Sequence, residues 1–135
     1  MTDSYLTRAR EIRNNPQRHC NCAQAVLEVF APVCGLSEEQ AHRLGAHFGS
    51  GMKMGATCGA ITGALMVIGL LGGDEGCRRE FLSSMKANHE QMTDCRDLLK
   101  KNAEAGRPKK QHCDELVYEA VEGVVRVMNL QKLPG

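Results

Sequence analysis

The sequence predicts an all-α fold, a single-domain bundle of five or six helices around a central glycine-rich apolar helix. Three observations lead to this prediction. Apolar residues recur at the three- and four-residue spacing of amphipathic helices, and the alternating pattern of half-buried strands is absent. Capping residues or glycines mark the ends of most of these stretches. The 135 residues are enough for one hydrophobic core, so we expect one domain over residues 1–135.

Helical character is found in seven stretches, at about residues 4–14, 21–34, 37–48, 58–71, 74–92, 95–103 and 113–128. The first is rich in arginine and weakly patterned, so we expect it at the periphery. The fourth contains CGAITGALMVIGL, carries no charge, and is expected at the centre of the bundle. The last has the most regular apolar stripe, which runs from Cys113 through Leu116 and Val117 to Met128.

Charge and aromatic content argue against binding to nucleic acid or to an anionic membrane. Lys and Arg total 17 and Asp and Glu total 16, which gives a net charge of only +1. Three Phe, two Tyr and no Trp provide few platforms for stacking bases. The uncharged stretch at residues 56–73 just reaches the length of a membrane span, but its five glycines and the lack of flanking aromatic residues favour a buried helix.

The cysteine content points to metal binding or redox chemistry. The N-terminal sequence MTDSYLTRAREIRNN lacks the apolar segment of a secretory signal, so we expect a cytoplasmic protein. Thiols stay reduced in the cytoplasm, so seven cysteines are not expected to form a set of structural disulfides.

Two shared features predict that four of the cysteines form one site; these are Cys22, Cys58, Cys95 and Cys113. Each precedes apolar residues at helical spacing, which directs its sulfur toward the core. The first three also follow capping residues, namely Asn21 with Gln24, Thr57 and Asp94, whereas Pro108 could start the last helix ahead of Cys113. A helix N-terminus stabilises the thiolate, which is the form that binds metal or attacks a disulfide.

The spacing of these four cysteines matches no local metal-binding motif. Intervals of 36, 37 and 18 residues separate them, so tertiary packing would have to assemble the site. The alternative is that they are small buried hydrophobic residues, since free cysteine is among the most buried residue types. The loop GSGMKMG lacks the spacing of a phosphate-binding loop and is interpreted as a turn that leads to Cys58.

Cys34 and Cys77 are given no role in this site. Cys34 lies on the same helical stripe as Phe30 and is interpreted as core filling. Cys77 stands four residues before Phe81 and so partly mimics the pattern of the four selected cysteines.

Histidines offer few further ligands. Cys20 stands in the sequence HCNC, where His19 and Cys22 could form a metal clip with it, although so tight a spacing is usually coincidental. His112 is the one histidine placed to join the predicted site, because it adjoins Cys113. A surface or capping position is the expected role of His112.

Four segments around the selected cysteines resemble the C_GCAxxG_C_C family, whose members are described as redox-active and are named for their cysteine and glycine pattern. They are NCAQAV at residues 21–26, GATCGAITGALMVIGL at 55–70, TDCRDLL around Cys95 and HCDELV around Cys113. The CGAxxG element is the most specific of them. The chain departs from the pattern by the extension NAEAGRPKK and by the additional cysteines Cys20, Cys34 and Cys77.

This resemblance implies a bound iron–sulfur cluster. A related domain occurs in split-Soret-type cytochromes, where cysteines of this kind are associated with an iron–sulfur centre. The resemblance therefore implies that the four cysteines, Cys22, Cys58, Cys95 and Cys113, ligate such a cluster. Four thiolates suit a [2Fe–2S] or [4Fe–4S] centre, and they suit tetrahedral zinc equally well.

Three functions follow as hypotheses. The leading one is electron transfer or redox sensing through an iron–sulfur cluster, with a redox partner protein. The second is a thiol–disulfide or sulfur-transfer protein, with Cys58 as the catalytic nucleophile because it heads the best-defined helix. The third is an interaction module that is stabilised by zinc or contains no metal. We also expect a homodimer, because the core is modest for so many helices.

Overall fold

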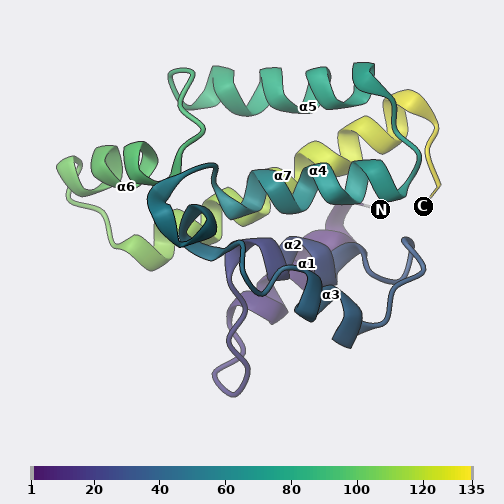
Figure 1. Cartoon of the computed structure of the whole chain (residues 1–135), viewed down its shortest axis with the longest axis horizontal. Coiled ribbons are helices and arrows are strands. Elements are labelled where there is room, and N and C mark those ends of the chain that lie inside the picture. The colour runs from purple at the N-terminus through teal and green to yellow at the C-terminus, as the bar shows by residue number, and fades with distance from the viewer. Residues whose placement is uncertain (1, 135) are drawn as a thin grey trace.

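The computed structural model describes residues 2–134, and this part of the chain is all-α (Figure 1). Its elements are α1 (Thr2–Arg13), α2 (Cys22–Phe30), α3 (Glu38–Leu44), the single turn η1 (Gly51–Gly55), α4 (Gly59–Leu70), α5 (Glu75–Asn88), α6 (Cys95–Glu104) and α7 (Lys109–Gln131). These seven α-helices exceed the expected five or six, because even the short α3 and α6 form separate helices, which pack on α2 and α7 respectively.

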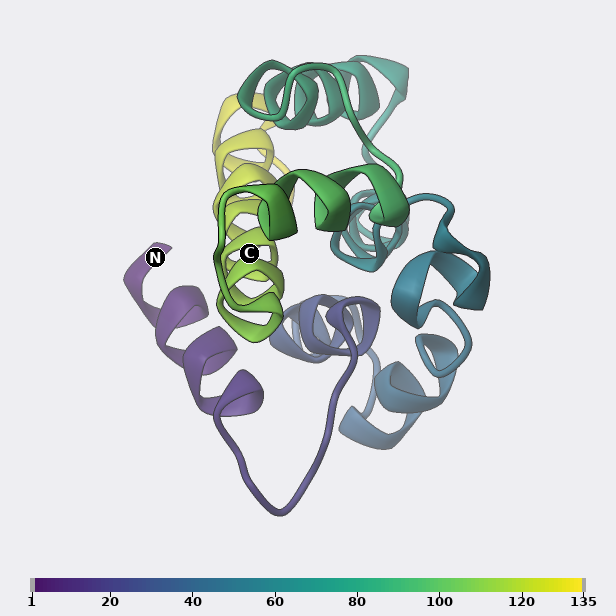
Figure 2. The ribbon, with the colours of Figure 1, turned by 90° about the vertical axis from the view of Figure 1, so that its left-hand side faces the viewer.

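The helices pack around α2 and α7. The 23-residue α7 contacts α1, α2, α4, α5 and α6, and α2 contacts α1, α3, α4 and α7. In Figure 1, α5 lies on one side of the α4–α7 pair and α1 to α3 lie on the other; Figure 2 shows α4 and α7 between these layers. The expectation that the other helices surround the glycine-rich α4 is not confirmed, because α2 and α7 contact more helices than α4 does, Leu70 is exposed, and Leu65 and Met66 are only partly buried.

The expected second helix is shorter than predicted. It ends at Phe30, and residues 31–35 form a turn that carries Cys34. Pro32 explains the difference, because it has no backbone N–H to donate to Glu28. The carbonyl of Glu28 instead accepts hydrogen bonds from the Ala31 N–H at 3.4 Å and from Arg8 Nε at 3.2 Å.

Membrane-spanning helices are absent from residues 2–134, where no helix is both long and apolar enough to cross a bilayer.

Two glycines allow α4 to lie unusually close to α2. A Cβ atom on Gly63 would be 3.0 Å from the carbonyl oxygen of Ala23 and 3.3 Å from Cβ of Val26. A Cβ atom on Gly59 would be 3.0 Å from the carbonyl oxygen of Phe48 and 3.1 Å from the backbone nitrogen of Ala23. Glycine inside a helix costs roughly 1 kcal/mol relative to alanine, and this close contact between backbones accounts for that cost.

This packing predicts opposite effects for two substitutions in α4. Gly63→Leu should lower the free energy of unfolding by about 1–3 kcal/mol, because the new side chain must force α4 away from α2. Gly69→Ala should raise the free energy of unfolding by roughly 0.5–1 kcal/mol, because a Cβ on Gly69 meets nothing within 4 Å and alanine favours the helix. Urea denaturation followed by circular dichroism measures both. Equal effects at the two positions would contradict the assigned role of Gly63.

Candidate functional site: a cavity lined by four cysteines

The structure brings the four selected cysteines to one cavity of about 190 Å³. They come from different parts of the fold: Cys22 from α2, Cys58 from the residue before α4, Cys95 from α6 and Cys113 from α7. The other residues that line the cavity are Arg13, His19, Asn21, Gly49, Ser50, Lys53, Gly59, Leu98, Leu99, Lys109, His112 and Leu116.

Cys22 occupies the position at a helix start that the sequence predicts. Asn21 precedes it as the N-cap and accepts a hydrogen bond from the Gln24 N–H at 2.8 Å, while the Gln24 side chain accepts one from the Asn21 N–H at 2.9 Å. This capping box fixes the first turn of α2. A Cβ on Gly49 would be 2.9 Å from the Asn21 side chain, so the glycine-rich loop packs directly on this cap.

A backbone contact that the sequence did not predict joins Cys58 to Cys95. Residues Thr57 and Asp94 form an antiparallel bridge. In it the Cys58 N–H donates to the Thr93 carbonyl at 2.9 Å, and the Cys95 N–H donates to the Ala56 carbonyl at 2.7 Å. The two cysteines are thus placed together by the segments that precede their helices.

The caps expected ahead of Cys58 and Cys95 differ from the prediction. Cys58 is itself the N-cap residue of α4, so Thr57 lies outside the helix. Asp94 is the N-cap residue of α6, but its side chain makes no capping hydrogen bond. The bridge accounts for both differences, because backbone pairing of residues 56–58 with 93–95 fixes these helix starts.

Cys113 lies in the second turn of α7, since that helix begins directly after Pro108. The earlier helix start that Pro108 makes possible is therefore observed. One consequence is that Lys109, in the first turn, lines the cavity together with Cys113.

Cys22 and Cys113 form a pair that shares a proton. The Cys22 thiol donates a hydrogen bond to the Cys113 sulfur, which lowers the pKa of Cys113 to about 6, and the positive charges of Arg13 and Lys109 act in the same direction. The same hydrogen bond and the burial of Cys22 raise the pKa of Cys22. Cys113 is therefore the member of the pair that ionises first.

Cys58 and Cys95 favour the neutral thiol. Burial raises the pKa of Cys58 to about 11, although the backbone N–H groups of Ala60 and Ile61 oppose this by favouring its thiolate. Burial also raises the pKa of Cys95, and the nearby Cys113 adds to the effect. A metal centre would reverse this preference, because a coordinating thiol is deprotonated outright.

The charged residues around the cavity are all basic. Arg13, Lys53 and Lys109 line it, and no carboxylate among residues 2–134 does so. Arg13 is held in place by its Nε atom, which donates to Asp114 Oδ1 at 2.7 Å, and by a second nitrogen, which donates to the Cys20 carbonyl at 2.8 Å. The cavity is therefore suited to a group with net negative charge.

His112 is buried, which differs from the surface or capping position expected for it. Only 8% of its surface is exposed, and its Nε2 atom finds no hydrogen-bond partner among residues 2–134. Burial lowers the pKa of His112, so it contributes a neutral imidazole to the cavity wall. Sequence spacing could not reveal this position, because the burial depends on where α7 begins.

The other three cysteines lie outside the cavity. Cys34 is in the turn after α2, and Cys77 is buried in the core on α5, where its N–H donates to Asp74 Oδ1 at 3.1 Å. The Cys20 side chain contacts Glu28 and His42, whereas His19 and Cys22 line the cavity. The metal clip of His19, Cys20 and Cys22 is therefore not formed.

Comparison with known proteins identifies the family of this chain. The sequence model of the family described as "Putative redox-active protein (C_GCAxxG_C_C)" matches residues 20–127, which include all four cavity cysteines. The chain belongs to this family. Searches of the curated proteins and of the solved structures found no match. The C_GCAxxG_C_C pattern thus corresponds, in this member, to cysteines gathered around one cavity.

As positioned, the cavity sulfurs are too widely spaced for one tetrahedral zinc ion. Tetrahedral zinc with Zn–S bonds of about 2.3 Å requires all four sulfurs to lie about 3.8 Å apart. No three of the cavity cysteines, all within the described residues, have sulfurs within 4.8 Å of one another.

Thiol alkylation tests the electrostatics of this site. In metal-free protein, we expect iodoacetamide to modify Cys113 before the other cavity cysteines, with a rate that rises as pH increases through about 6, because the thiolate is the reactive form. Below that pH the rate should fall about tenfold per unit. Peptide mass spectrometry after brief labelling measures the order and the midpoint.

The variant Cys22→Ala serves as the control. It removes the thiol that donates to Cys113, so the midpoint for Cys113 should move to higher pH. An unchanged midpoint, or faster labelling of Cys58 than of Cys113, would contradict the proton sharing between Cys22 and Cys113.

Proposed function

We propose that this protein is an electron-transfer or redox-sensing protein in which Cys22, Cys58, Cys95 and Cys113 ligate an iron–sulfur cluster. The observation that carries the proposal is the convergence of four thiols on one cavity whose charged lining residues are all basic. A cluster bound by four thiolates is anionic, and basic side chains compensate its charge.

The residues of the chain have separable roles in this proposal. The four thiols supply the ligands, and Arg13 and Lys109 offset their negative charge. The leucines Leu98, Leu99 and Leu116 provide apolar lining, which limits access of water. When bound, the cluster supplies one-electron transfer, and its potential depends on charge, on hydrogen bonds to sulfur and on exposure.

A second candidate is thiol–disulfide exchange by Cys22 and Cys113, and the proton-sharing pair favours it. The Cys113 thiolate would attack a disulfide of a partner protein, and one partner sulfur would leave as a thiol. Cys22 would then displace the second partner sulfur, so the partner gains two thiols and the pair becomes a disulfide. The low pKa of Cys113 and the high pKa of Cys58 favour Cys113 over Cys58 as the nucleophile in this reaction.

Anaerobic purification distinguishes the two candidates. The iron–sulfur proposal predicts a coloured protein that contains iron and acid-labile sulfide. Cys58→Ser and Cys113→Ser should each lose most of the iron and the visible absorption, whereas Cys34→Ser should keep both, because Cys34 lies outside the cavity. Equal iron content in all three variants would contradict the assignment of Cys58 and Cys113 as cluster ligands. A colourless wild-type protein that reduces disulfides would support the exchange reaction instead.

Gly59→Ala gives a second test of the cluster proposal. Alanine favours the helix, but its Cβ would lie 3.0 Å from the Phe48 carbonyl oxygen and 3.1 Å from the backbone nitrogen of Ala23, the residue after Cys22. The added methyl group therefore shifts Cys22 relative to Cys58. We expect circular dichroism like that of the wild type and reduced iron content after anaerobic reconstitution. Unchanged iron content would assign Gly59 to helix packing alone.

A further inference from the structure

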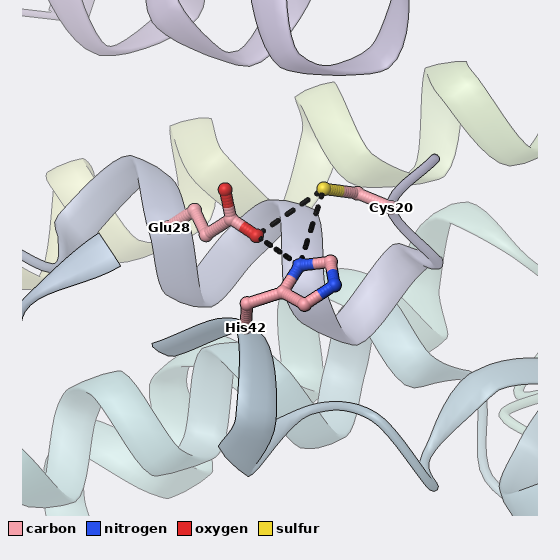
Figure 3. Close-up of side chains that lie close together, drawn as sticks. All are labelled: Cys20, Glu28 and His42. Carbon is pink, nitrogen blue, oxygen red and sulfur yellow. Dashed lines mark hydrogen bonds and ion pairs between the residues drawn. The ribbon is translucent and has the colours of Figure 1, made fainter. Parts of the chain in front are cut away.

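Cys20, Glu28 and His42 form a cluster of metal-binding side chains outside the four-cysteine cavity (Figure 3). Cys20 Sγ lies 3.2 Å from Glu28 Oε2 and 3.8 Å from His42 Nδ1, and Oε2 lies 2.8 Å from Nδ1. The three side chains come from the segment before α2, from α2 and from α3, and Figure 3 shows them pointing toward one another.

These distances are close to those around a zinc ion. With Zn–N and Zn–O bonds of about 2.0 Å and a Zn–S bond of about 2.3 Å, tetrahedral ligands lie about 3.3 Å apart for N and O and about 3.5 Å apart when sulfur is included. Each of the three observed separations is within about 0.5 Å of these values. Small side-chain adjustments would therefore accommodate the ion.

Burial and access also suit a metal site. Glu28 is fully buried at 0% exposure and Cys20 is 4% exposed, so the donors are fixed by packing. The His42 side chain is 29% exposed, which leaves a route by which an ion can enter.

We propose that Cys20, Glu28 and His42 form a second, independent binding site for a divalent metal ion, with zinc as the best-suited metal. One sulfur, one imidazole nitrogen and one carboxylate oxygen are the donor types that zinc accepts together, and a set of three leaves a fourth position for water or another ligand. This site does not depend on whether the cavity cysteines bind a cluster.

A bound ion would replace the protons that link Cys20, Glu28 and His42 through hydrogen bonds. The Cys20 thiol donates to Glu28 Oε2, and Nδ1 of His42 is within hydrogen-bond distance of the same oxygen. Binding releases the thiol proton, and the Nδ1 proton moves to Nε2 so that Nδ1 can coordinate. The thiolate and the carboxylate then balance the two positive charges of the ion.

Arg18 brings a positive charge to these side chains and would compete with a metal ion for them. Its guanidinium pairs with Glu28 Oε1 and lies 3.5 Å from Cys20 Sγ. Glu38, 3.3 Å from the same nitrogen, offers Arg18 a partner when a cation occupies the cluster. Removal of this positive charge should therefore strengthen metal binding.

Zinc content measured with matched variants tests the proposal. After equilibration with zinc and removal of excess, wild-type protein should hold about one more zinc per chain than His42→Gln or Cys20→Ser. The controls His47→Gln and Cys34→Ser change an exposed histidine and a cysteine outside the cluster, so they should match the wild type. Arg18→Gln should bind this zinc roughly tenfold more tightly in competition with a chelator.

Two results would overturn the proposal. Equal zinc content in the wild type, His42→Gln and Cys20→Ser would identify the cluster as a hydrogen-bonded network only. An Arg18→Gln variant with unchanged or weaker affinity for zinc would lead to the same conclusion. If Cys20→Ser fails to fold, the comparison of His42→Gln with His47→Gln decides. Iron content and visible absorption of the same samples report on the four-cysteine cavity separately.

Discussion

The close approach of α4 to α2 is the contact on which the four-cysteine cavity depends. Gly59 and Gly63 permit it, because a Cβ at either position would come within 3.2 Å of the backbone of Ala23. Ala23 directly follows Cys22, and Gly59 directly follows Cys58. The contact between backbones therefore fixes the separation of the first two thiols, and the other two are added by the Thr57–Asp94 bridge and by the packing of α7.

Two opposing effects act on the thiols at this site. Burial favours neutral sulfur and raises the pKa of Cys58 and Cys95, while Arg13, Lys109 and the Cys22 hydrogen bond favour the thiolate of Cys113. The result is an uneven set in which one sulfur ionises near neutral pH and the others keep their protons. Such a set is poised either for metal ligation, which removes the remaining protons, or for exchange at a single sulfur.

Much of the site was predictable because its signals are local. An apolar stripe behind each cysteine, together with the capping box at Asn21 and the caps expected at Thr57 and Asp94, selected the four cysteines that line the cavity. The Thr57–Asp94 bridge, the burial of His112 and the contact of Cys20 with His42 were not predictable, because each joins segments that are distant in sequence and carry no periodic pattern. The early end of α2 at Phe30 did have a local signal in Pro32, which the apolar stripe outweighed.

Residues 18–22 include side chains of both proposed metal sites. Cys20 and Cys22 are two positions apart, and their side chains serve the Glu28–His42 cluster and the cavity respectively. Arg13 holds this segment to α7, because it donates to the Cys20 carbonyl and to Asp114 beside Cys113. The segment from 14 to 21 contains no helix, so its order must come from such contacts. Arg13 thereby fixes Cys20 relative to the start of α7, and the short segment between Cys20 and Cys22 carries this restraint to the first thiol of the cavity.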